Sequence, residues 1–259
     1  MPDHSAALTY SSYLALDEVL GAQRPRSDEH DELLFIVIHQ VYELWFKQIL
    51  HEVVELQRRL EAGEIPHAIR TLRRILTVLK VVVAQIDVLE TMTPSQFTGF
   101  RSRLDASSGF QSAQFRELEA ALGRRDTRVL DHYPEGGDRD RIAAALARPS
   151  IFDSFLAFLG KLGYGDLARA DVSAPLEPSA SRQEVLLRVY ADDGGAASVA
   201  ELLVDLDEGL QEWRYRHVKM VERTIGDKTG TGGSSGAHYL RGTLFTPMFP
   251  DLWAVRSKL

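Results

Sequence analysis

Two of the eight histidines lie on stretches with helical spacing whose neighbouring positions are apolar. His217 belongs to a series at steps of three and four residues: Leu206, Leu210, Trp213, His217, Met220 and Thr224. This spacing places an imidazole in the middle of an otherwise apolar helix face. Such a histidine is either a core residue bonded to a backbone carbonyl or an axial haem ligand, which requires a neutral imidazole on a rigid element within an apolar cavity. Periodicity leaves both interpretations open.

His39 has a similar setting, one turn after Phe35 and one turn before Glu43. It is either structural or a pocket histidine that hydrogen-bonds a substrate N–H or acts as an acid or base. The remaining histidines are predicted to be surface or structural residues. They are His4, His30, His51, His67, His132 and His238. No HxxxH or HExxH spacing occurs, so a local zinc site is not indicated.

The segment Gly230–Gly236 (GTGGSSG) is rich in glycine but does not have the order of a phosphate-binding loop, since Lys228 comes before the glycines. It is either a linker or a lid whose backbone groups and Thr231 hydroxyl close over a small polar ligand. The chain has no cysteine, which excludes disulfides, iron–sulfur clusters, thiolate-ligated haem and covalent c-type haem. The formal net charge of −7 argues against nucleic acid as a partner.

The segments that carry these residues have apolar positions at helical spacing, which predicts α-helices. Long helices are predicted over 32–60, 67–89 and 199–225, with a shorter one over 113–122 that ends at Gly123. Ser27 or Asp28 is expected to cap the first of them. Shorter helices are expected within 139–147 and 154–162, with a loop over 173–182 and a turn over 192–198. The stretch 185–190 fits a strand or the start of a helix.

These elements predict an all-α, single-domain chain over 1–259 with a helix-bundle core, in which residues 1–8 are expected to be flexible. The N-terminus has no basic segment followed by a long apolar run, and no segment offers about 20 uninterrupted apolar residues. We therefore expect neither a secretory signal nor a membrane span, and a cytoplasmic location.

Four long segments resemble the tryptophan 2,3-dioxygenase family, in the family's order along nearly the whole chain. They are Leu8–Leu14 (LTYSSYL), Asp31–Lys47 (DELLFIVIHQVYELWFK), Leu89–Phe115, which contains SGFQS, and Tyr215–Leu240, which contains GTGGSSG. The resemblance implies an all-α fold with a haem pocket, one haem b per subunit that is ferrous when active, and a homotetramer built as a dimer of dimers.

The resemblance also implies a role for each matching residue. His217 matches the proximal ligand of the haem iron, and His39 matches the distal histidine, with a catalytic role and a hydrogen bond from the substrate's indole N–H. Arg101 matches the arginine that pairs with the substrate carboxylate, for which a guanidinium fork is suited. The other matching positions are substrate-binding residues: Phe35 and Phe97 as aromatic walls, Ser108 and Gly109 beside the oxygen site, Thr231 at the amino-acid head group, and Tyr10, Tyr13 and Leu14 reaching into a neighbouring subunit's pocket.

The implied reaction is the opening of the indole ring of L-tryptophan, or of a close indole amino acid, by O2 to give N-formylkynurenine, the first step of the kynurenine pathway. Two alternatives stay open. One is a haem-dependent monooxygenase of the same superfamily that acts on a substituted tryptophan or indole. The other is a non-catalytic haem sensor, which would leave Arg101 and the glycine-rich segment without a role.

Overall fold

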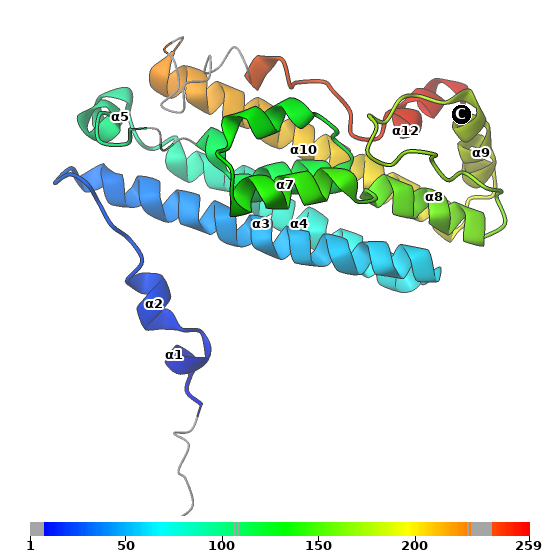
Figure 1. Cartoon of the computed structure of the whole chain (residues 1–259), viewed down its shortest axis with the longest axis horizontal. Coiled ribbons are helices and arrows are strands. Elements are labelled where there is room, and N and C mark those ends of the chain that lie inside the picture. The colour runs from blue at the N-terminus through cyan, green and yellow to red at the C-terminus, as the bar shows by residue number, and fades with distance from the viewer. Residues whose placement is uncertain (1–7, 106, 108, 227, 229–239) are drawn as a thin grey trace, which may run out of the picture.

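Three long helices run side by side and form the body of the protein in this computed structural model (Figure 1). They are α3 (His30–Ala62), α4 (Ile65–Leu89) and α10 (Gly195–Ile225). The structure describes residues 8–105, 107, 109–226, 228 and 240–259, without the side chain of Phe110. Within these ranges every regular element is helical, which confirms the all-α fold class. Residues 1–7 lie outside them, so the expected flexibility of 1–8 stays a prediction.

Shorter helices surround the three long ones. They are α1 (Tyr10–Tyr13), α2 (Leu16–Leu20), α5 (Pro94–Arg101), α6 (Ala113–Leu122), α7 (Gly137–Ala147), α8 (Ile151–Lys161), α9 (Ala180–Ala191) and α12 (Pro250–Ala254). Three 3-10 turns complete the described elements: η1 (Gly109–Gln111), η2 (Thr127–His132) and η3 (Val255–Lys258). The stretch 185–190 is therefore part of helix α9, and the loop expected over 173–182 ends at Ser179, whose side chain caps that helix.

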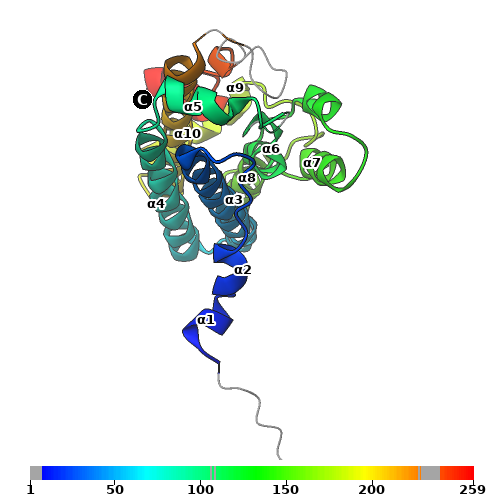
Figure 2. The same cartoon turned by 90° about the vertical axis from the view of Figure 1, so that its left-hand side faces the viewer.

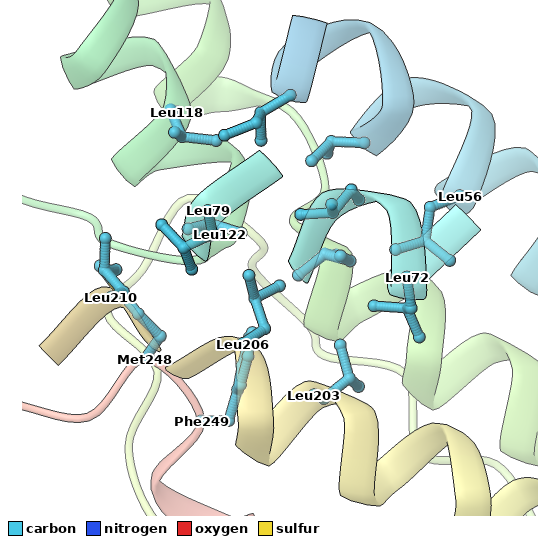
Figure 3. Close-up of a cluster of buried hydrophobic side chains, with 14 of the residues drawn as sticks. Leu56, Leu72, Leu79, Leu118, Leu122, Leu203, Leu206, Leu210, Met248 and Phe249 are labelled. Carbon is cyan, nitrogen blue, oxygen red and sulfur yellow. The ribbon is translucent and has the colours of Figure 1, made fainter. Parts of the chain in front are cut away.

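The long helices pack through apolar stripes with a spacing of three and four residues, which is what the sequence predicts. Figure 3 shows leucines of α3, α4, α6 and α10 converging on one cluster, joined by Met248 and Phe249. A second cluster joins α6 and α7 through Ala120 and Ile142, together with Tyr133, the residue that follows η2. Burial of these stripes, rather than helix propensity alone, stabilises helices of this length.

The start of α3 corrects the cap predicted from Ser27 or Asp28. The N-cap residue is Glu29, and its side chain makes no capping hydrogen bond. Instead the buried carboxylate of Glu32 accepts hydrogen bonds from the backbone N–H groups of Arg26 and Ser27, at 2.8 Å each. The Ser27 hydroxyl donates to the same carboxylate at 2.5 Å, so it holds the incoming chain instead of capping the helix.

The turn predicted over 192–198 is found at residues 192–194, and the rest of that range belongs to α10. The helix begins at Gly195, four residues before the predicted start. A Cβ built on Gly195 would lie 2.7 Å from Cγ2 of Ile65, so only glycine allows this close approach of α10 to the beginning of α4. Gly195, one of the glycines that suggested a turn, serves helix packing.

Two stretches of the described chain, His30–Ala62 and Gly137–Lys161, are long and apolar enough by composition to cross a membrane. The first is α3, which packs against α4, α6 and α8. The second consists of α7 and α8, between which Ser150 caps the new helix with a reciprocal hydrogen bond to Asp153. Core helices can have the same composition, and within the described chain 22% of the apolar window of the first stretch and 61% of that of the second are buried.

Helices α1 and α2 project away from the body, as both views show (Figures 1 and 2). Tyr10 and Tyr13 are 76% and 72% exposed, and Leu14 is also exposed. Among the described residues, these three line no pocket of their own chain. This projecting arm, helices α1 and α2, joins the body where Gln23 donates a 2.6 Å hydrogen bond to Gln40 of α3.

Candidate active site

A large cavity lies between α3, α4, α5, α6 and the second half of α10. It holds about 1580 Å³ of empty space, which includes its opening to solvent. Of the residues predicted for the site, it brings together Phe35, His39, Phe97, Arg101, Gly109 and His217. Ser108 and Thr231 lie outside the described residues, and Tyr10, Tyr13 and Leu14 lie on the projecting arm. Residues far apart in the sequence thus meet at one apolar site.

His39 presents a hydrogen-bond acceptor at the cavity. Its Nδ1 lies 2.7 Å from the carbonyl oxygen of Phe35, one turn earlier on α3. Since a carbonyl can only accept, Nδ1 carries the proton and donates, which leaves the lone pair on Nε2. Burial lowers the pKa of His39, so the neutral imidazole is the form present near pH 7.

His217 lies on α10 and lines the same cavity. Burial, with smaller effects of His39 and Arg116, lowers its pKa to about 4, so it too is a neutral imidazole near pH 7. The indole of Trp213, one turn earlier, stacks on it with ring centroids 5.1 Å apart. Within the described part of the chain, no hydrogen bond to either ring nitrogen of His217 is found, which argues against the structural interpretation of this residue.

Helix α5 carries the arginine and one aromatic wall. Thr93 and Gln96 form a reciprocal cap at its start: the Thr93 N–H donates to the Gln96 side chain at 2.8 Å, and Gln96 N–H donates to the Thr93 hydroxyl at 3.4 Å. Phe100 is fully buried, with its ring 5.6 Å from that of Phe35, and so fixes α5 against α3. This anchoring places Phe97 and Arg101 at the cavity.

Two aromatic side chains form a narrow part of the cavity beside His39. The Phe35 ring lies 4.1 Å from the imidazole of His39 and 5.8 Å from the ring of Phe97. Gly109 closes the space opposite, since a Cβ built on it would lie 3.9 Å from Nε2 of His39. The accepting Nε2 of His39 therefore faces the cavity beside Gly109 and next to the aromatic rings.

Several cavity residues were missed by reasoning from the sequence. Tyr42 and Phe46 lie on the same helix as His39 and line the cavity, but neither was singled out as a site residue. Arg116, Glu119 and Arg214 also line the cavity, and all three are buried. Charged residues on a helix ordinarily mark a solvated face, and the contact between Glu119 and Arg214 joins residues 95 apart in the sequence. No local pattern could have indicated it.

Together the fold and the cavity define the class of protein: an all-α protein with an interior ligand cavity in which neutral histidines, an arginine and aromatic rings converge, as in enzyme active sites. A family model described as tryptophan 2,3-dioxygenase matches residues 2–145 and 170–259. The chain belongs to the tryptophan 2,3-dioxygenase family.

Curated relatives agree with this assignment. A tryptophan 2,3-dioxygenase of Anaeromyxobacter sp. (strain K) is 68% identical, over 99% of this chain and 98% of its own length. One from Herpetosiphon aurantiacus is 54% identical over 98% of this chain and 100% of its own length. One from Caulobacter vibrioides is 44% identical over 97% of this chain and 98% of its own length. These matches confirm the resemblance found in the sequence.

Proposed function

We propose that the protein uses haem, bound through His217, to open the indole ring of L-tryptophan with O2 and form N-formylkynurenine. The observation that carries the proposal is the convergence of two neutral histidines, Arg101 and two phenylalanines on one apolar cavity. The names of the relatives support the reaction and the substrate.

The residues of the cavity fit a haem. An axial ligand must be a neutral imidazole within an apolar cavity, and His217 meets both conditions. The buried Tyr42 hydroxyl and Trp213 indole N–H line the cavity without a hydrogen-bond partner among the described residues, and a bound group with polar edges would provide partners. Groups of three or more His, Asp or Glu that could hold a bare metal ion do not occur in the described ranges. The proposed cofactor is haem b, one per chain and ferrous when active, which supplies the binding and activation of O2.

The remaining residues bind and orient the substrate. Arg101 pairs with the carboxylate of the amino acid, and the rings of Phe35 and Phe97 confine the indole. The lone pair on Nε2 of His39 accepts the hydrogen bond of the indole N–H, because Nδ1 is occupied by the Phe35 carbonyl. Ser108 and Thr231 stay predicted contacts, since they lie outside the described residues. The protein's contribution is then orientation of the reactants and exclusion of water.

The direct test is incubation of purified, haem-loaded, reduced protein with L-tryptophan and O2, with the product separated and identified. Formation of N-formylkynurenine at a rate proportional to protein is expected. A haem-loaded protein that leaves L-tryptophan unchanged would refute the proposed activity.

The fall of kcat/KM on the acid side of its pH profile is expected to follow the protonation of His39. Its pKa lies below the ordinary value of 6.5, so the neutral acceptor is present above that pH. Protonation adds a hydrogen to Nε2 and turns the acceptor into a donor, so kcat/KM should fall about tenfold per pH unit below the lowered pKa. In His39→Asn, which does not titrate, the acid side of the profile should flatten, and an unchanged acid side would show that another group controls it.

Substitution of Gly109 by alanine tests the space beside His39. The added methyl group would make ordinary contacts, 3.9 Å from Nε2 and 4.0 Å from Cδ2 of His39, so the fold should be retained. It would occupy the place of the indole edge, so KM for L-tryptophan should rise about tenfold, the lower range for one methylene in a binding pocket. Gly137→Ala is a matched control, because a Cβ at Gly137 meets nothing within 4 Å. An unchanged KM in Gly109→Ala would remove Gly109 from the substrate site.

We also propose a homotetramer, a dimer of dimers, in which the projecting arm inserts Tyr10, Tyr13 and Leu14 into a neighbouring subunit's pocket. Their exposure supports this, since large apolar side chains on a projecting segment are typical of contacts with another chain. The net charge of −7 supports the absence of a nucleic-acid partner. A cytoplasmic enzyme without membrane association completes the proposal.

A further inference from the structure

Three arginines surround one buried glutamate at the wall of the cavity, and we call these four residues the Glu119 cluster. Arg116 donates to the Glu119 carboxylate at 2.6 Å, Arg214 at 2.9 Å and Arg124 at 3.3 Å. Arg116 and Glu119 belong to α6 and Arg214 to α10, so the cluster joins the two helices beside His217. Arg116, Glu119 and Arg214 line the cavity, whereas Arg124 lies behind them.

The members that line the cavity are charged although they are buried. Glu119 and Arg214 are 4% exposed and Arg116 is 8% exposed. Burial alone would raise the pKa of Glu119, but the three arginines outweigh it and hold that pKa below its ordinary value. Glu119 is therefore a carboxylate anion. Charges in such a place interact through protein rather than water, so they act over longer distances than surface charges.

The cluster contains more positive than negative charge. Three guanidinium groups face the carboxylate of Glu119, and Asp126 adds a second carboxylate, 3.8 Å from Arg124 and away from the cavity. Arg116 and Arg214 line the same cavity as His217, so the charge of the cluster lies at the wall of the proposed haem site. A positive wall favours the reduced, less positive state of a bound iron centre, and net charge around such a centre is one of the factors that set its reduction potential.

We propose that Glu119 is a positioning residue that sets the reduction potential of the bound haem, by holding Arg116 and Arg214 at the cavity wall and offsetting part of their charge. The inference rests on the proposed haem at His217. Glu119 then controls the ratio of ferric to ferrous protein, and hence the fraction able to bind O2, although it touches neither substrate nor iron.

The test is a spectroelectrochemical titration of haem-loaded Glu119→Gln. The amide keeps the shape of the side chain and removes the negative charge. The ferrous-to-ferric ratio at a given potential should rise about tenfold, the order expected for one unit charge acting through protein. For a one-electron couple this is a shift of about 59 mV to more positive potential. Glu117→Gln on the same helix is the control, because the carboxylate of Glu117 contacts only the outward-facing Arg141 and Arg148 among the described residues. The reduction potential of the haem in this variant should not change.

The direction in which a second substitution shifts the reduction potential separates an electrostatic role of Glu119 from a structural one. Arg116→Gln removes a positive charge at the wall and leaves Glu119 paired with Arg214 and Arg124, so the potential should move in the opposite direction by a similar factor. A structural role alone would move both variants in the same direction or leave both unchanged, and either result overturns the inference. If Glu119→Gln does not retain haem, the reduction potentials of Arg116→Gln and Arg214→Gln are measured instead. Unchanged potentials in both variants overturn the inference.

Failure of the inference can be distinguished from failure of the proposed function. Wild-type protein that takes up no haem, or takes it up equally well after His217→Ala, contradicts the proposed function. Wild-type protein that binds haem through His217, but whose potential does not respond in opposite directions to Glu119→Gln and Arg116→Gln, contradicts the inference alone.

Discussion

His217→Ala is expected to give a folded protein that no longer retains haem. The substitution removes the only protein ligand proposed for the iron, and partners that merely orient a ligand already contribute about 10–100-fold to metal affinity. The loss of affinity should therefore exceed about 100-fold, and dioxygenase activity should disappear with it. The measurement is the haem absorbance per chain after reconstitution, with circular dichroism as the check on the fold.

Two controls make this result specific. His51→Ala changes an exposed histidine of α3 and should leave haem content unchanged. Imidazole added to His217→Ala should restore part of the haem absorbance, because it can occupy the space of the missing side chain. Full haem content and activity in His217→Ala would contradict the assignment of the ligand.

Arg101→Gln is expected to retain haem and lose affinity for L-tryptophan. The substitution removes the contact with the substrate carboxylate, and hydrogen bonds to a charged group contribute roughly 1.5–3 kcal/mol, so KM should rise about 10–100-fold. Arg101→Lys keeps the charge without the planar fork and should fall between wild type and Arg101→Gln. Steady-state kinetics on protein with matched haem content measures both variants.

Arg103→Gln is the matched control for this prediction. Arg103 is exposed, two residues beyond Arg101, and does not line the cavity. Its substitution should leave KM unchanged. An unchanged KM in Arg101→Gln, or an equal rise in Arg103→Gln, would show that Arg101 does not bind the carboxylate.

The helices were predictable from the sequence because their apolar spacing is local. The stripes of α3, α4 and α10 follow steps of three and four, and the structure buries them as expected. Helix boundaries were predictable only where a local signal acts, as at Gly123, which ends α6 with a φ of 123°. At Gly195 the local signal was misleading, because its glycine is required by a neighbouring helix that the sequence pattern cannot place.

The site was predictable in part, for a similar reason. The apolar faces of α3 and α10 indicated His39 and His217, while the roles of Arg101 and Gly109 came from the resemblance to the family. The Glu119 cluster could not be predicted as a whole, since Arg214 reaches Glu119 from a helix distant in sequence. The contacts of Tyr10, Tyr13 and Leu14 with a second subunit stay predictions, because they depend on another chain.

Incorporation of labelled oxygen into the product distinguishes a dioxygenase from a monooxygenase. Anaerobically reduced, haem-loaded protein is mixed with L-tryptophan, fully labelled O2 is admitted, and the product is weighed by mass spectrometry. N-formylkynurenine that contains two labelled oxygen atoms is expected. A product with one labelled atom would contradict the proposed dioxygenase reaction and assign the protein to monooxygenase chemistry.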